Sequence, residues 1–130
     1  MKVSDDLKKI IFNKLKENLE SITPPFISTV GNDPNSYELI GNTPVPYGST
    51  KKIVPGMYFA SIVIRKDSVV FYFFPCYSFP NLIETIPILA KCLKGKTCFH
   101  FTKEDQINEK ELSQLLKKGM SIWKKEGYIK

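Results

Sequence analysis

Cys98 and His100 have the types and spacing that most directly suggest chemistry, since they stand two residues apart in TCFHFT. If this stretch is a strand, both side chains point to the same face. A thiol and an imidazole so placed could form a nucleophile and its base, or two ligands of a metal ion. A structural zinc site needs four converging ligands, and the chain adds only Cys76 and Cys92, with no CxxC pair and no second histidine. We therefore expect a half-buried thiol and a hydrogen-bonded imidazole.

Carboxylates are the second group that could do chemistry, because they bind hard cations such as ferrous iron or calcium. Asp5, Asp6, Glu17 and Glu20 all fall in the first predicted helix, and Glu17 and Glu20 share a helix face at i, i+3 spacing. These four residues are the candidate metal ligands, for weak iron binding. Solvation and the electrostatics of helix ends explain them more simply, so no resident cofactor is expected.

Familiar catalytic and nucleotide-binding motifs are absent from the sequence. It contains no GxGxxG, Walker loop, HExxH or GxSxG. GNTPVPYGSTKK, residues 41–52, has the residue types of a phosphate loop but neither its spacing nor its helix context. We therefore predict a protein without a catalytic site.

Aromatic side chains crowd into residues 58–77, YFASIVIRKDSVVFYFFPCY. The pattern predicts a β-hairpin with its turn at Lys66-Asp67. Both faces of this hairpin are largely apolar, whereas a half-exposed hairpin alternates with polar residues. One face would pack on helices, and the second would meet more chain, a ligand or another subunit. Strict alternation places Phe59 on the same face as Ser61 and Arg65.

The second face is the candidate binding surface, an aromatic floor with a cationic edge. Such a surface could bind a flat apolar ligand, stacked bases or a partner subunit. The candidate ligand-binding residues are Tyr58, Phe59, Arg65, Tyr72, Phe74, Tyr77 and His100.

Two amphipathic helices should flank these strands. In residues 4–22, apolar side chains recur every four residues, and Pro24-Pro25 ends the pattern. The second helix, residues 109–126, begins after Asn108, which can cap its first amides. Glu111, three residues on, could complete a capping box. Gly119 inside this helix predicts a close approach to the sheet, since glycine is otherwise unfavourable there.

Shorter elements complete the pattern. Residues 26–30, 36–41 and 97–102 read as strands, and 31–35 as a turn. Residues 42–57 read as a long surface loop with one short edge strand around 52–54, and 86–94 as a short helix that Gly95 ends. The predicted fold is one α+β domain over residues 1–130: a mainly antiparallel sheet of five or six strands, the two terminal helices on one face, and a short third helix.

Charge and composition exclude several classes of protein. The net charge of +6 on 130 residues is spread over many segments with acids between the lysines, which indicates a solvated surface rather than a nucleic-acid footprint. No apolar run approaches the ~20 residues of a membrane helix, and MKVSDDLKKIIF is unlike a signal peptide. The three cysteines have no regular spacing, which indicates reduced thiols. We therefore expect a cytoplasmic protein without a membrane segment.

Three stretches resemble the YdhG-like family, a group of small bacterial proteins classed as a domain of unknown function. They are GMYFASIVIRKDSVVFYFFPCY (56–77), CLKGKTCFHF (92–101) and LLKKGMSIWKKEGYI (115–129), and the likeness spans about residues 37–129. The resemblance implies helices on an antiparallel sheet, similar to the frataxin-like arrangement. It also implies a relation to proteins linked to intracellular iron delivery, and it implies no catalytic residue.

The leading expectation is a non-catalytic binding or protein-interaction module. It would present the second hairpin face to a small apolar molecule, a partner protein or a second copy of the chain. The main alternative is a weak iron chaperone of frataxin type that uses the four carboxylates of the first helix. A second alternative is single-stranded nucleic-acid binding through Tyr72, Phe74 and nearby lysines, and an enzyme that uses Cys98 is the last.

Overall fold

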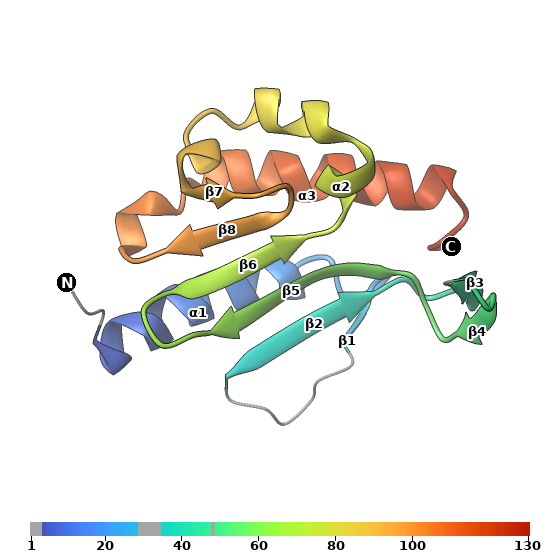
Figure 1. Ribbon diagram of the computed structural model, residues 1–130, viewed down its shortest axis with the longest axis horizontal. Coiled ribbons are helices and arrows are strands. Elements are labelled where there is room, and N and C mark those ends of the chain that lie inside the picture. The colour runs from blue at the N-terminus through green and yellow to red at the C-terminus, as the bar shows by residue number, and fades with distance from the viewer. Residues whose placement is uncertain (1–3, 29–34, 48) are drawn as a thin grey trace.

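The computed structural model describes residues 4–28, 35–47 and 49–130, and its central feature is a six-stranded sheet in the order β1-β2-β5-β6-β8-β7. Every neighbouring pair of strands in this sheet is antiparallel. The helices α1 and α3 both lie behind the sheet in Figure 1, so they cover the same face. The predicted α+β class is therefore confirmed. The six strands are β1 (Ile27–Ser28), β2 (Ser36–Ile40), β5 (Tyr58–Ile64), β6 (Val69–Phe73), β7 (Leu93–Lys94) and β8 (Cys98–Phe101).

The two long helices follow the sequence pattern closely. Helix α1 (Asp5–Glu20) begins where Ser4 Oγ accepts a hydrogen bond from the Leu7 amide at 3.2 Å. Its apolar stripe is buried against the sheet. Helix α3 (Glu109–Lys125) ends before Gly127, whose φ of +85° is the left-handed conformation that glycine adopts without a steric penalty. None of the helices in the described part of the chain is long and apolar enough to cross a membrane.

Gly119 brings α3 against two phenylalanine rings of the sheet. A Cβ atom at this position would lie 2.5 Å from Phe73 Cζ and 2.9 Å from Phe59 Cε1, closer than real Cβ atoms approach other heavy atoms. The close approach predicted from the sequence is therefore confirmed.

We expect Gly119→Ala to destabilise the protein by a net loss of about 1–2 kcal/mol, because overpacking of the two rings by the extra methyl group costs up to about 3 kcal/mol. The clash would outweigh the ~1 kcal/mol that alanine gains in a helix interior. Urea unfolding measures the change. Ser121→Ala, on the exposed side of the same helix, is the matched control and should change stability by no more than about 0.5 kcal/mol. A Gly119→Ala protein at least as stable as the parent would contradict this account.

Phe59 lies on the opposite face of β5 from the one that strict alternation predicts. The pairing of β2 with β5 skips this residue, because Leu39 pairs with Ala60 and Ile40 pairs with Tyr58. Such a bulge adds one unpaired residue to the strand, so the alternation of side chains between the two faces shifts by one residue at this point. Phe59 is 0% exposed, and its ring stacks on Phe26 at 4.0 Å between centroids. The prediction of Phe59 as a surface ligand-binding residue is therefore wrong.

Glu111 does not complete a capping box. Asn108 Oδ1 does accept a hydrogen bond from the Glu111 amide at 2.9 Å, as predicted. The Glu111 carboxylate turns elsewhere: it accepts hydrogen bonds from the amides of Ile88 at 2.9 Å and Leu89 at 2.8 Å. This buried carboxylate therefore joins α3 to the segment before β7.

We expect Glu111→Ala to cost about 2–3 kcal/mol of stability, because two amides would lose a charged acceptor in a largely buried site. Thermal or urea unfolding measures the loss. Glu109→Ala is the matched control, since Glu109 is exposed in the same first turn and contributes only through the helix dipole. Equal losses for the two variants would show that the buried hydrogen bonds contribute nothing specific.

The predicted helix 86–94 is wrong. The chain forms α2 (Pro75–Ser78), then two 3-10 helices, η1 (Pro80–Thr85) and η2 (Leu89–Cys92), and then strand β7. Lys94 of β7 pairs with Cys98 of β8, so Gly95, with φ +79°, lies in a hairpin turn rather than at a helix end. Pairing with β8 satisfies backbone groups of this short stretch.

Two further differences concern loops. Residues 42–57 contain a separate two-stranded ribbon, β3 (Val45–Tyr47) with β4 (Lys52–Val54), where a loop with one edge strand was predicted. This ribbon lies beyond one end of the sheet (Figure 1). The turn predicted over residues 31–35 and the end of the predicted 26–30 strand lie largely outside the described residues. A last 3-10 helix, η3 (Glu104–Gln106), precedes α3.

Candidate functional site

The sheet face opposite α1 and α3 carries no helix in the described part of the chain (Figure 1). The antiparallel register arranges its side chains in rows across the strands. Val63 of β5, Val70 of β6 and His100 of β8 form one row. Tyr72 pairs with Cys98 in the next row. This face is therefore a mixture of apolar and polar groups, whereas the predicted second face was largely apolar.

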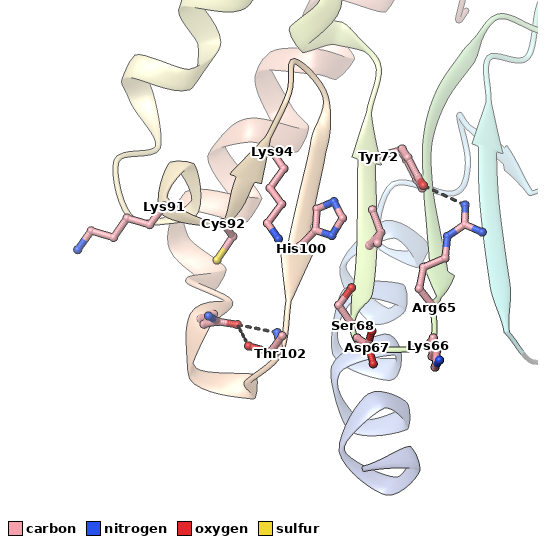
Figure 2. Close-up of a pocket in the computed structure, with 12 residues that line it drawn as sticks. Arg65, Lys66, Asp67, Ser68, Tyr72, Lys91, Cys92, Lys94, His100 and Thr102 are labelled. Atoms are coloured by element: carbon pink, nitrogen blue, oxygen red, sulfur yellow. Dashed lines mark hydrogen bonds between the residues drawn. The ribbon is translucent and has the colours of Figure 1, made fainter. Parts of the chain in front are cut away.

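A hollow of about 830 Å³ opens on this face over β6, β8 and β7. Val70, Tyr72 and His100 contribute to its lining from the strands. The β5–β6 turn, residues 65–68, borders it on one side, and Lys91, Cys92 and Lys94 border it on the other (Figure 2). Thr102 and Gln106 border a third side. The sheet and three flanking segments thus define a single concave surface.

Arg65 and Tyr72 form one polar side of the hollow. The Arg65 guanidinium donates a hydrogen bond from Nη2 to the Tyr72 hydroxyl at 3.0 Å (Figure 2). The turn that carries Arg65 is anchored from the helix side, because buried Lys8 of α1 donates from Nζ to the Lys66 carbonyl at 2.6 Å. The hydrogen bond and the anchored turn hold the arginine in place at the edge of the hollow.

Lys94 and His100 form the other polar side. The Lys94 side chain extends alongside the imidazole in Figure 2. Partial burial lowers the pKa of His100 below its ordinary value of 6.5, and the positive charge of Lys94 lowers it further. The imidazole is therefore neutral at pH 7, with one nitrogen able to donate and one able to accept a hydrogen bond.

The hollow has an excess of positive charge. Its lining includes Arg65, Lys66, Lys91 and Lys94 but only one carboxylate, Asp67. Among the described residues the salt bridges are those of Lys8 with Asp5 and of Lys14 with Glu104, so none involves the four cations of the hollow. The hollow therefore presents positive charge that no carboxylate of the described chain pairs directly.

The predicted binding residues divide into two groups. Arg65, Tyr72 and His100 meet in the hollow. Tyr58, Phe74 and Tyr77 form a separate aromatic cluster: the ring centroids of Tyr58 and Phe74 are 5.6 Å apart, and those of Phe74 and Tyr77 5.9 Å. Burial raises the pKa of Tyr58 to about 12, although its hydroxyl bonds to Ser61 Oγ at 2.6 Å.

Lys94 is the main lining residue that the sequence reasoning missed. The sequence pattern predicts a helix over residues 86–94, so it does not predict that Lys94 belongs to a strand of the sheet. The signal that could have located it is the stretch LKGKTCFHF, in which a glycine-containing turn separates two extended runs.

The cysteines do not form a reactive site with His100. Within the described residues no hydrogen bond joins Cys98 to the imidazole, and Cys98 Sγ instead lies 3.7 Å from Thr97 Oγ1. Burial raises the pKa of Cys76 to about 12 and also raises that of Cys92. These two thiols therefore stay protonated at neutral pH, and a protonated thiol is a poor nucleophile and metal ligand.

The four candidate metal ligands do not converge. Asp5 and Asp6 stand in the first turn of α1, and Glu17 and Glu20 in its last turns. The two pairs are separated by about 18 Å along the helix axis. In the ranges 4–28, 35–47 and 49–130, no three His, Cys, Asp or Glu side chains are grouped so that they could hold a metal ion.

Comparison with known proteins does not assign the chain to a family. No protein-family model matches it, and no curated protein or solved structure matches it either. The resemblance to the YdhG-like family therefore stays a prediction.

The lowered pKa of His100 predicts a pH dependence of stability. Between that pKa and 6.5, the unfolded chain holds more protons than the folded one, so stability falls as the pH is lowered through this window and is unaffected above it. Because His100 is the chain's single histidine, its NMR titration is unambiguous. We expect Lys94→Met to raise the pKa of His100 toward 6.5 without reaching it, since partial burial remains. An unchanged pKa in this variant would contradict the assigned role of Lys94.

Proposed function

We propose that this chain is a non-catalytic binding module whose ligand occupies the hollow on the uncovered sheet face. The observation that carries the proposal is the convergence of Arg65, Tyr72 and His100 in a hollow of about 830 Å³. Small-molecule sites commonly measure ~300–1,000 Å³ and combine apolar surface with a few polar groups. The partly exposed ring of Tyr72 above buried Val70 supplies apolar surface, and the polar atoms of the three named side chains supply hydrogen-bonding groups.

The rigidity of the surroundings supports a binding role. The floor belongs to paired strands, and buried Lys8 anchors the 65–68 turn that carries Arg65. A preformed site loses little conformational entropy when a ligand binds, so more of the contact energy is available as affinity.

The polar groups of the hollow suit hydrogen bonding and the attraction of charge. A nucleophile needs an adjacent base that is itself oriented by a third group. In the described residues Cys98 has no hydrogen bond to His100, and Asp67 is the one carboxylate that lines the hollow. The groups that remain can donate and accept hydrogen bonds and attract charge.

Single-stranded nucleic acid is a second candidate ligand for the same face. Tyr77 is 59% exposed and stacks on Phe74, and Lys96 Nζ lies 5.3 Å from the centroid of the Tyr77 ring. Exposed aromatic rings with nearby cations are the usual platform for stacked bases and their phosphates. None of these three residues lines the hollow, so the two candidates predict different contacts.

A fragment screen by NMR tests the proposed function. The probes are soluble aromatic acids, bases and neutral compounds, added to ¹⁵N-labelled protein. We expect binders to shift the amide signals of Val70, Tyr72 and His100, which line the hollow. Tyr72→Ala should weaken them by about tenfold or more, a loss of ~1.4 kcal/mol.

Tyr47→Ala is the matched control, since Tyr47 is 47% exposed in the separate β3–β4 ribbon. It should leave the affinities unchanged. Binders that shift other surfaces only, or that lose affinity equally in both variants, would refute the proposed function.

A further inference from the structure

We infer that the ligand of the hollow is a small phosphorylated molecule with a flat apolar body. Its phosphoryl group would lie between Lys94 and His100, and its body would extend across Val70 toward Arg65 and Tyr72. The inference rests on the proposed function and names the class of ligand that the same site accepts.

Charge complementarity is the first argument. Four cationic residues and one carboxylate line the hollow, and the Lys91 side chain extends away from it (Figure 2), so the lining carries about two excess positive charges when His100 is neutral. No salt bridge within the described residues involves any of the four cations. A phosphate monoester carries close to two negative charges at neutral pH, whereas a carboxylate carries one. The phosphoryl group therefore matches the excess better.

The placement of the polar groups is the second argument. Lys94 and His100 lie together on β7 and β8, whereas Arg65 and Tyr72 meet at the β5–β6 side (Figure 2). Val70 shares a row with His100 and is only 1% exposed, so the partly exposed ring of Tyr72 is the main apolar surface between the two polar sides. This arrangement suits a ligand with an anionic group at one end and a flat body that covers the floor.

The shape of the hollow favours a small molecule over a long chain. The 65–68 turn, the segment around Lys91 and Lys94, and the pair Thr102 and Gln106 border it on three sides. A polymer that crossed the sheet would have to pass over these borders.

A bound phosphoryl group would couple to the protonation of His100. The titratable or charged groups around this imidazole are Lys94 of β7, Cys92 of η2, Cys98 of its own strand, Tyr72 of β6 and Arg65 of the turn. Asp67, the one carboxylate that lines the hollow, belongs to the opposite border. An anion beside the imidazole would favour its protonated form. Binding should therefore raise the pKa of His100.

The test is an NMR titration of the full chain with four probes: phenyl phosphate, benzoate, benzyl alcohol and orthophosphate. We expect phenyl phosphate to bind most tightly, to shift the amides of Val70 and His100, and to raise the midpoint of the His100 titration. Lys94→Met should weaken phenyl phosphate by about tenfold or more, because a charge-assisted contact is lost. Lys118→Met is the matched control: it removes one positive charge from exposed α3, and we expect less than about a twofold change.

The outcomes separate this inference from the proposed function. If benzoate or benzyl alcohol binds the hollow as tightly as phenyl phosphate, the inferred ligand class is wrong and the binding module stands. Equal losses in Lys94→Met and Lys118→Met would also overturn the inference, because the anion would then bind through bulk charge. If a single-stranded oligothymidylate binds far more tightly than phenyl phosphate and shifts Phe74 and Tyr77, the ligand is nucleic acid. If neither these probes nor any screened fragment shifts the hollow, the proposed function fails as well.

Discussion

The burial of phenylalanine rings on one side of the central strands is the constraint on which the rest of the structure depends. Phe71 and Phe73 of β6 and Phe99 and Phe101 of β8 are each at most 1% exposed beneath the helices. Because side chains alternate along a strand, a register slip of one residue would turn these rings toward the uncovered face. The same alternation that buries the rings aligns Val70 with His100 and Tyr72 with Cys98 on that face. Core and hollow are therefore set by one register.

Two buried charged groups connect the long helices to the segments that border the hollow. Lys8 is 6% exposed and donates to the carbonyl of Lys66 in the β5–β6 turn. Glu111 is 8% exposed and accepts from the amides that begin η2. Each joins a long helix to a short segment that borders the hollow. A charged side chain can remain buried here because its head group is hydrogen-bonded to the backbone.

The sequence predicts the parts of this fold that have a strong period. The α1 stripe, the β5–β6 hairpin and α3 with its glycine follow from spacing alone, as do Arg65, Tyr72 and His100 as candidate surface residues. The sequence-based predictions fail where a tertiary contact determines the local structure. The bulge at Phe59 depends on the pairing with β2, which no local pattern encodes. Residues 93–94 become a strand because β8 lies beside them, and this pairing brings Lys94 to the hollow. The excess of positive charge in the hollow likewise could not be predicted from the sequence, because it depends on which residues, distant in the chain, line the same hollow.

The edge of the sheet at β7 limits how another polypeptide could join this molecule. Only Leu93 and Lys94 pair there, and Gly95 then turns the chain away. A strand that docked edge to edge would find two residues of backbone and a charged side chain, which is a common protection against aggregation. Growth of the sheet by strand addition, as in amyloid or in peptide-binding domains that extend their sheets, is therefore disfavoured on this side.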